Sequence, residues 1–193
     1  MIITFEGGDG VGKTTQTALL AVHLEKEGQP VVTIREPGGS ALSEKIRALF
    51  VESPMDAMTE LLLVLASRRE NITQIIEPVQ EAGKTIIIDR FIDSTLVYQG
   101  LVGGLGIEKV KAIMQATGTW LEPDTTFVLD MAPELACSRF APSDRFEHRD
   151  TDYHRRLREG FLAISTDKRH RIIDAAQSQE GVFRAIIARL EKA

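Results

Sequence analysis

The sequence contains a single cysteine, Cys137, among its 193 residues. One thiol cannot form an intrachain disulfide, and a structural zinc site needs more soft ligands than this chain offers. Basic residues are also not in excess, because 23 Lys and Arg stand against 28 Asp and Glu, a formal net charge of -5. This balance argues against broad electrostatic binding to a nucleic-acid polymer or an anionic membrane. We therefore expect a cytoplasmic protein whose ligands are nucleotides rather than nucleic acids.

Long apolar runs are missing as well. The first apolar segment, residues 2–5, is far shorter than the roughly 20 residues of a membrane helix, and no later run approaches that length. Nothing in the sequence marks the protein for export or for a membrane. With 43% apolar and 26% charged residues, the composition is that of a compact globular protein. We expect residues 1–193 to form a single domain.

Short β-prone runs alternate with helical patterns along the chain. The near-continuous apolar runs at 85–88 and 125–129 are typical of strands buried on both faces. The expected strands are 2–5, 30–34, 85–88, 125–129 and 171–173, and the expected helices are 13–27, 42–51, 59 to about 81, and a last helix through 182–190. This order predicts an α/β fold, a three-layer parallel sheet of about five strands flanked by helices.

A phosphate-binding motif lies between the first expected strand and helix. Residues 7–14 read GGDGVGKT and satisfy G-x-x-x-x-G-K-[ST] in the context that the motif requires. The glycines let backbone N–H groups wrap an anion, Lys13 reaches the β and γ phosphates, and the Thr14 hydroxyl can bind magnesium. The motif predicts a P-loop NTPase fold, but it does not separate a kinase from a GTPase switch or a motor ATPase. The expected ATP-binding residues are Gly7, Gly8, Asp9, Gly10, Val11, Gly12, Lys13, Thr14 and Thr15.

Arginines follow two further strands. Arg35 opens the segment REPGG after the second expected strand, and Asp89-Arg90 follows the third. Open α/β sheets bind their ligands at the carboxyl ends of strands, where a planar guanidinium can hold a phosphate through two hydrogen bonds. These segments argue against a P-loop switch or regulatory ATP-binding module, which would need no acceptor site.

Four blocks together resemble the thymidylate kinase family of bacterial type. They are FEGGDGVGKTTQ from Phe5, REPGG from Arg35, DRFIDSTLVYQG from Asp89, and DRFE from Asp144. The similarity covers nearly the whole chain. It implies transfer of the ATP γ-phosphoryl group to dTMP, with ATP and Mg²⁺ as cofactors. It also implies a homodimer formed through the helix at 59–81, although the apolar stripe of this helix would equally suit packing within one chain.

The resemblance also implies roles for individual residues. It places Asp9 on the deoxyribose 3′-hydroxyl, Arg35 and Arg90 at the acceptor phosphate, and Arg68 at the base. The implied acceptor site is Asp9, Arg35, Val64, Arg68, Arg90, Ser94, Thr95 and Tyr98, and Ser94 and Tyr98 could instead cap or pack a helix. The implied catalytic residues are Lys13, Arg90, Arg139 and Arg145, the last two on a short lid at about 139–151. Thr14 and Asp89 are the implied magnesium residues, with Asp89 holding either the ion's shell or Arg90.

The sequence departs from the family pattern at two places. Val64 stands one helical turn before Arg68, where the family has a phenylalanine that stacks on thymine. One alternative is that the preferred acceptor is dUMP, a 5-modified dUMP or another deoxynucleoside monophosphate. The other is that a side chain such as Phe91 supplies the aromatic ring face that Val64 lacks. The lid is also shorter than usual. Its closure is then either less complete or stiffened by Phe140 and Pro142.

Overall fold

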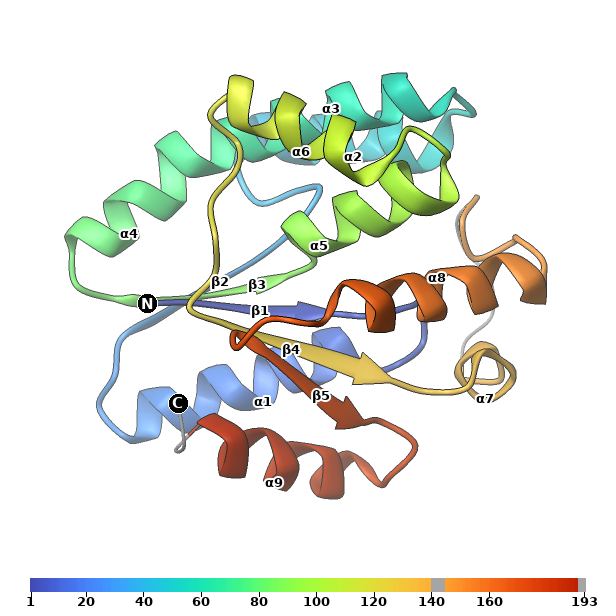
Figure 1. The fold of residues 1–193 in the computed structure, drawn as a ribbon. Coiled ribbons are helices and arrows are strands. Elements are labelled where there is room, and N and C mark those ends of the chain that lie inside the picture. The colour runs from blue at the N-terminus through green and yellow to red at the C-terminus, as the bar shows by residue number, and fades with distance from the viewer. Residues whose placement is uncertain (140–144, 191–193) are drawn as a thin grey trace.

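The computed structural model describes residues 1–139 and 145–190 and contains one five-stranded sheet over that part of the chain (Figure 1). All neighbouring strands run parallel, in the order β2-β3-β1-β4-β5. The strands are β1 (Ile2–Glu6), β2 (Val31–Arg35), β3 (Thr85–Asp89), β4 (Thr125–Asp130) and β5 (His170–Asp174). The predicted α/β architecture with a parallel sheet of about five strands is confirmed.

Helices cover both faces of the sheet. Figure 1 shows α1 and α9 on one face and α2, α3, α5 and α6 on the other. The α-helices are α1 (Lys13–Lys26), α2 (Ala41–Glu52), α3 (Ala57–Asn71), α4 (Glu77–Glu81), α5 (Ile92–Thr95), α6 (Ile107–Ala116), α7 (Pro133–Cys137), α8 (Thr151–Ile164) and α9 (Gln179–Leu190). Two π-helical segments, η1 (Ile72–Ile76) and η2 (Leu96–Val102), follow α3 and α5. The sequence patterns did not indicate η2, α6 or α8.

The long helix expected from residue 59 to about 81 is present as α3, η1 and α4 in succession. Its start is fixed by Asp56, whose Oδ1 accepts hydrogen bonds from the backbone N–H of Met58 at 2.9 Å and of Thr59 at 3.0 Å. This is the usual capping arrangement for an acidic residue at a helix N-terminus. The expected helix differs from the structure at residues 72–76, which form a π-helical turn. The helix is wider there, and the apolar periodicity of the sequence does not indicate this.

The register of the sheet sets where the ligand site lies. Every residue of β1 and of β3 is buried, which the apolar runs predicted. Arg35 of β2 and Phe5 of β1 both pair with Asp89 of β3. The residues that leave these three strands at their carboxyl ends therefore meet at one edge of the sheet. Those residues are the phosphate loop, the segment after Arg35, and Arg90.

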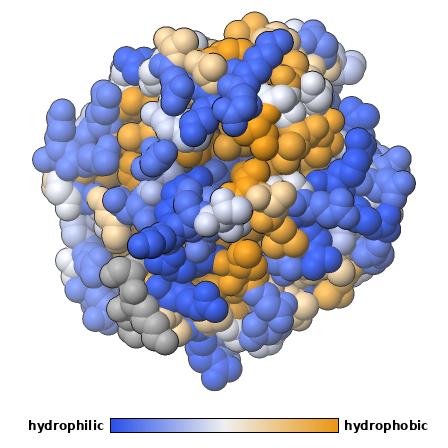
Figure 2. All heavy atoms as spheres, in the orientation of Figure 1, coloured by the Kyte–Doolittle hydropathy of each residue, from blue (hydrophilic) through white to orange (hydrophobic). Residues whose placement is uncertain are grey.

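The surface carries a mixture of residue types. Figure 2 shows hydrophilic residues over much of one face, with apolar residues gathered between them. Large exposed apolar side chains include Leu42 and Leu49 of α2 and Leu62 of α3. Within the described part of the chain, no helix combines the length and apolar character needed to cross a membrane.

Candidate active site

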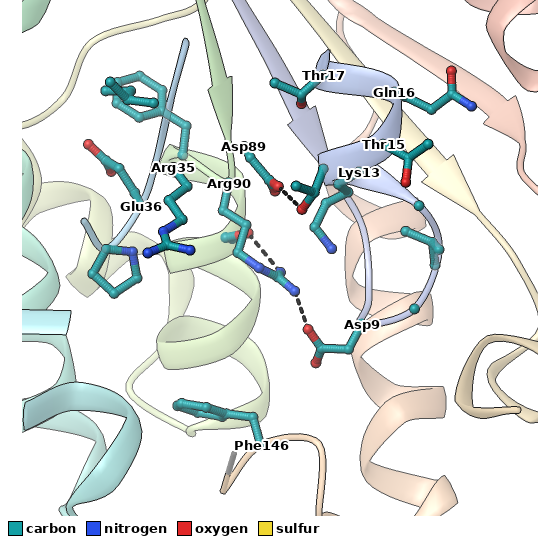
Figure 3. Close-up of a pocket in the computed structure, with 18 of the residues that line it drawn as sticks. Asp9, Lys13, Thr15, Gln16, Thr17, Arg35, Glu36, Asp89, Arg90 and Phe146 are labelled. Atoms are coloured by element: carbon teal, nitrogen blue, oxygen red, sulfur yellow. Dashed lines mark hydrogen bonds and ion pairs between the residues drawn. The ribbon is translucent and has the colours of Figure 1, made fainter. Parts of the chain in front are cut away.

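A cavity of about 1060 Å³ opens at the carboxyl ends of β1, β2 and β3. Pockets for one small ligand are typically roughly 300–1,000 Å³, so this cavity is at the upper limit of that range. Lys13, Arg35 and Arg90 reach toward its middle from three different strand ends (Figure 3). The wall comprises the phosphate loop from Asp9 to Thr15, then Arg35, Glu36, Val64, Arg68, Asp89, Arg90, Ser94, Thr95, Tyr98, Arg139 and Phe146, among others. Most of the residues expected at the site are thus brought together.

The phosphate loop has the backbone that an anion cradle requires. Gly7, Gly10 and Gly12 have φ values of 132°, 74° and 99°, in the region that favours glycine. A Cβ on Gly7 would lie 2.6 Å from the carbonyl oxygen of Leu129, so only glycine fits where the loop passes β4. Helix α1 starts at Lys13, and Gly12 has no side chain to cap it. The first N–H groups of α1 therefore remain available to a phosphate.

Lys13 is buried at the base of this cradle. Its Nζ donates a hydrogen bond to the carbonyl oxygen of Gly8 at 2.6 Å. Burial, together with the nearby Arg90 guanidinium, lowers the pKa of Lys13 to about 8, and Asp89 and Asp9 only partly oppose this. The neighbouring carboxylates therefore do not fully offset the burial of the Lys13 ammonium group, and bound phosphates would supply further negative charge.

Thr14 and Asp89 have the chemistry of a magnesium site. The Thr14 hydroxyl donates to Asp89 Oδ2 at 2.6 Å, so two hard oxygen ligands lie side by side at the end of the phosphate loop. Magnesium takes oxygen ligands, and it usually binds one or two carboxylates while phosphates and water complete its shell. The two residues therefore fit the ion. The hydrogen bond between Asp89 and Thr14 favours the magnesium role of Asp89 over that of holding Arg90.

Asp9 and Arg90 form an ion pair across the cavity (Figure 3). Arg90 also donates to the carbonyl oxygen of Gly7 at 3.1 Å, and its guanidinium lies 5.2 Å from the centre of the Tyr98 ring. Tyr98 Oη donates to the second oxygen of Asp9 at 3.2 Å. Burial opposes ionisation of Asp9, but Arg90 and Lys13 outweigh it and lower the pKa of this carboxyl. Asp9 is thus held as an anion that accepts hydrogen bonds.

Arg90 has an unusual backbone conformation, with a φ of 67°. Such a value is uncommon for a residue other than glycine and costs of order 1–3 kcal/mol. Glu6 supports this turn from below, because it accepts hydrogen bonds from Phe91 N at 2.7 Å and Ser94 Oγ at 2.5 Å. Burial and the nearby Asp93 raise the pKa of Glu6 to about 7, although Ser94, Phe91 and Arg90 pull it down. Glu6 was not assigned a role from the sequence, although a charged residue at the end of a buried strand is a signal for one.

Arg68 lies at the deep end of the cavity wall. Its Nε donates to Glu36 Oε2 at 2.7 Å, and its NH2 group donates to Thr95 Oγ1 at 2.9 Å. The guanidinium also lies 4.8 Å from the centre of the Phe91 ring, which is fully buried. Glu36 was not assigned a role from the sequence, since its partner is 32 residues away in the chain.

Val64 stands one turn before Arg68 on α3 and is accompanied by two aromatic side chains. Phe50 of α2 and Phe146 stack with their ring centres 5.3 Å apart and their planes 25° from parallel. Phe50, Val64 and Phe146 belong to one buried apolar cluster, and all three line the cavity. Phe50 received no role from the sequence, because nothing in the spacing of residues 50 and 64 shows that they meet.

Of the three remaining arginines expected at the site, two line the cavity and one does not. Arg35 lines the cavity, is 55% exposed and pairs with Glu44 at 3.1 Å. Arg139 also lines the cavity, and its NH1 group donates to the carbonyl oxygen of Ala175 at 3.4 Å. Arg145 is not among the lining residues. Its Nε instead donates to the carbonyl oxygen of Phe50 at 2.9 Å. Phe140, Pro142 and Asp144 of the expected lid lie outside the described residues.

Comparisons with known proteins agree with one another. Residues 5–186 match the family model described as thymidylate kinase. A thymidylate kinase of Synechococcus sp. (strain JA-3-3Ab) is 43% identical over 174 residues, covering 90% of this chain and 85% of that protein. One from Symbiobacterium thermophilum is 42% identical, covering 96% and 90%. The crystal structure of thymidylate kinase from Ehrlichia chaffeensis superposes with a TM-score of 0.79 at 35% identity, covering 98% of both chains.

Proposed function

Since this chain belongs to the thymidylate kinase family, we propose that it transfers the γ-phosphoryl group of ATP to dTMP, giving dTDP and ADP. The observation that carries the proposal is that one cavity holds both a phosphate loop and a second arginine-containing site. A phosphate loop alone would suit any nucleotide hydrolase. The second site, with Arg35, Arg90 and Asp9, supplies what a phosphoryl acceptor needs.

The donor site is the phosphate loop from Gly7 to Thr15. Its backbone N–H groups and the start of α1 bind the ATP phosphates, and Lys13 holds the β and γ phosphates. Thr14 and Asp89 would hold magnesium, which would neutralise part of the negative charge of the donor phosphates. The burial of Lys13 supports its role, since a desolvated ammonium interacts more strongly with an arriving phosphate.

The acceptor site lies on the other side of Arg90. Arg90 and Arg35 bind the dTMP phosphate, since guanidinium groups match phosphate oxygens in geometry and charge. Asp9 accepts a hydrogen bond from the deoxyribose 3′-hydroxyl, and Tyr98 packs against the sugar. Arg68 and Thr95 lie deeper in the wall and contact the base, with Ser94 lining the site near Arg90. Support for this arrangement comes from the ion pair and hydrogen bonds that hold Asp9, Arg90 and Tyr98 together.

The transfer step needs positive charge around the moving phosphoryl group. Little covalent chemistry is required of the protein, so positioning and electrostatic stabilisation account for most of the catalysis. Lys13 and the nearby Arg90 supply this charge, and Arg139 supplies more from the start of the lid. The catalytic role expected of Arg145 from the sequence is not part of this proposal, because its Nε and NH1 groups bind Phe50 of α2 and Glu60 of α3.

A direct assay tests the proposal. ADP release is measured with dTMP, dUMP, dCMP, dGMP and 5-substituted dUMP, with the Lys13→Ala variant as the matched negative control. We expect dTMP to give the highest kcat/KM and Lys13→Ala to lose nearly all turnover. Equal ADP release with and without every nucleotide would refute the kinase activity. A shifted acceptor, which the comparisons do not favour, would appear as a higher kcat/KM for another nucleotide.

We further propose that two copies associate through the outer faces of α2 and α3. Leu42, Leu49 and Leu62 are 50%, 56% and 56% exposed there, so both helices present apolar side chains that a second copy could cover. Sedimentation velocity distinguishes a dimer from a monomer, and Leu49→Asp should shift a dimer to the monomer. We place the reaction in the cytoplasm, in keeping with the free thiol of Cys137.

A further inference from the structure

The nucleobase end of the acceptor site requires an apolar wall, and the cavity offers four described aromatic side chains for it. These are Phe50, Phe91, Tyr98 and Phe146. Phe91 is fully buried under the Arg68 guanidinium, and Tyr98 is engaged by Asp9 and Arg90. Phe50 and Phe146 line the cavity beside Val64, an aliphatic residue that cannot present an aromatic face itself.

The position of this ring pair relative to the polar groups suits a base. Val64 and Arg68 are four residues apart on α3 and so share one face of the helix. Tyr98, which reaches Asp9, meets the Phe146 ring edge-on with ring centres 5.9 Å apart. The ring pair therefore lies between the part of the cavity assigned to the sugar and the turn of α3 that carries Arg68.

Arg145 holds the two rings together. Its guanidinium lies 4.1 Å from the centre of the Phe146 ring and 5.2 Å from that of Phe50. Its Nε donates to the carbonyl oxygen of Phe50 at 2.9 Å, and its NH1 group pairs with Glu60 at 2.5 Å. Glu60 in turn accepts a hydrogen bond from Gln99 at 3.0 Å. The described end of the lid segment is thereby held against α2 and α3 through one side chain.

We propose that Phe50 and Phe146 form the wall against which the acceptor pyrimidine packs, and that Arg145 is the residue that positions this wall. The inference rests on the proposed function and deepens it. Base binding is then shared between Phe50 of α2 and Phe146 of the lid segment, rather than resting on α3 alone. Arg145 acts through the two phenylalanines and not on the transferring phosphoryl group.

Phe50→Leu and Phe146→Leu test the wall by removing one ring each while keeping an apolar side chain. Phe183→Leu, on α9 at the opposite face of the sheet, is the matched control. Because a leucine cannot stack on a base as an aromatic ring does, we expect the dTMP KM to rise about tenfold in each wall variant. The ATP KM of the wall variants should stay within twofold of the value of the unmodified protein. In Phe183→Leu, the dTMP KM and the ATP KM should both stay within twofold. A dTMP KM within threefold of the unmodified protein in either folded wall variant, judged by circular dichroism, would overturn the proposal.

Arg145→Ala separates positioning from catalysis. If Arg145 holds the wall, the dTMP KM rises about tenfold while kcat stays within threefold. A fall in kcat as large as the rise in KM would overturn the positioning role. Calorimetric titration of dTMP into each variant gives the same ranking without turnover. Calorimetry therefore distinguishes the absence of an aromatic wall from the absence of kinase activity. The proposed function is tested separately, because it requires the unmodified protein to turn over dTMP.

Discussion

Arg68 and Glu36 form an ion pair inside the protein, with Nε and Oε2 2.7 Å apart and side-chain exposed fractions of 1% and 2%. The second Glu36 oxygen accepts a hydrogen bond from Asn71 Nδ2 at 3.2 Å. Burial raises the pKa of Glu36 despite the attraction of Arg68, so the carboxylate is costly to leave unpaired. The pair joins α3 to the segment after β2. Arg68 therefore stabilises the fold in addition to any contact it makes with a base.

Arg68→Ala is expected to destabilise the protein strongly, because it leaves the buried Glu36 carboxylate without its cation. Breaking one partner of a buried pair typically costs about 3–5 kcal/mol. Urea unfolding at neutral pH measures the loss. The control is Arg184→Ala, which removes a solvent-exposed pair with Glu180 and should cost no more than about 0.5 kcal/mol. Equal stability of the two variants would contradict the structural role of Arg68.

Thr14 and Asp89 lead to a prediction about magnesium. Asp89→Asn removes the negative charge beside the Thr14 hydroxyl, so the magnesium concentration needed for half-maximal ADP formation should rise by at least about tenfold. Thr14→Ser keeps the hydroxyl and should leave this requirement nearly unchanged, whereas Thr14→Val should raise it. A magnesium titration at saturating ATP checks all three. An unchanged requirement in Asp89→Asn would remove Asp89 from the metal site.

The parts of the molecule that were predictable from the sequence depend on local patterns. The phosphate loop follows from the glycines and Lys13 in eight consecutive residues, and β3 follows from an uninterrupted apolar run. The position of Arg90 beside the loop follows from the rule that parallel strands end at one edge. Helix α8 was missed although Asp150 caps it, with Oδ1 accepting from Tyr153 N at 2.8 Å. This capping residue is visible in the sequence, so the start of α8 was predictable from a local pattern.

Other features depend on contacts between distant residues, which spacing does not encode. The partner of Glu6 is Ser94, 88 residues away, and Arg145 reaches Phe50 across 95. The substitution of Val64 for an aromatic residue was visible, but the aromatic side chains beside it come from other segments of the chain. A single sequence shows that a wall is missing at position 64. It does not show which side chain occupies the space.

The lowered pKa of Lys13 predicts proton uptake when ATP binds. At a pKa of about 8, roughly half of the ammonium groups are neutral at pH 8 in the free protein. The ATP phosphates favour the charged form and raise this pKa, so binding should take up about half a proton at pH 8 and more at pH 9. Calorimetry in buffers of different ionisation enthalpy measures the uptake. Lys13→Arg, which stays charged, should abolish it. Identical binding enthalpies in all buffers would contradict the prediction.

Glu6 predicts a dependence of stability on pH whose sign follows from its environment. Its pKa is raised from 4.5 to about 7, by burial and by Asp93. Below about pH 4.5 the group is protonated in the folded and unfolded chains alike, and its contribution to stability is fully present. Between pH 4.5 and 7 the unfolded chain releases the proton first, so stability falls as the pH rises, and above about pH 7 the loss is complete.

Glu6→Gln removes this titration while an amide oxygen can still accept the hydrogen bond from Phe91 N. The stability of the unmodified protein relative to this variant should therefore fall by about 2–3 kcal/mol between pH 5 and pH 8. Urea unfolding at pH 5, 6, 7 and 8 measures the difference. Glu81→Gln, at the exposed end of α4, should follow the unmodified protein at every pH. Parallel curves for the Glu6 variant and the unmodified protein would mean that Glu6 is already ionised at pH 5. The hydrogen bonds from Ser94 and Phe91 would then outweigh the cost of burying the charge.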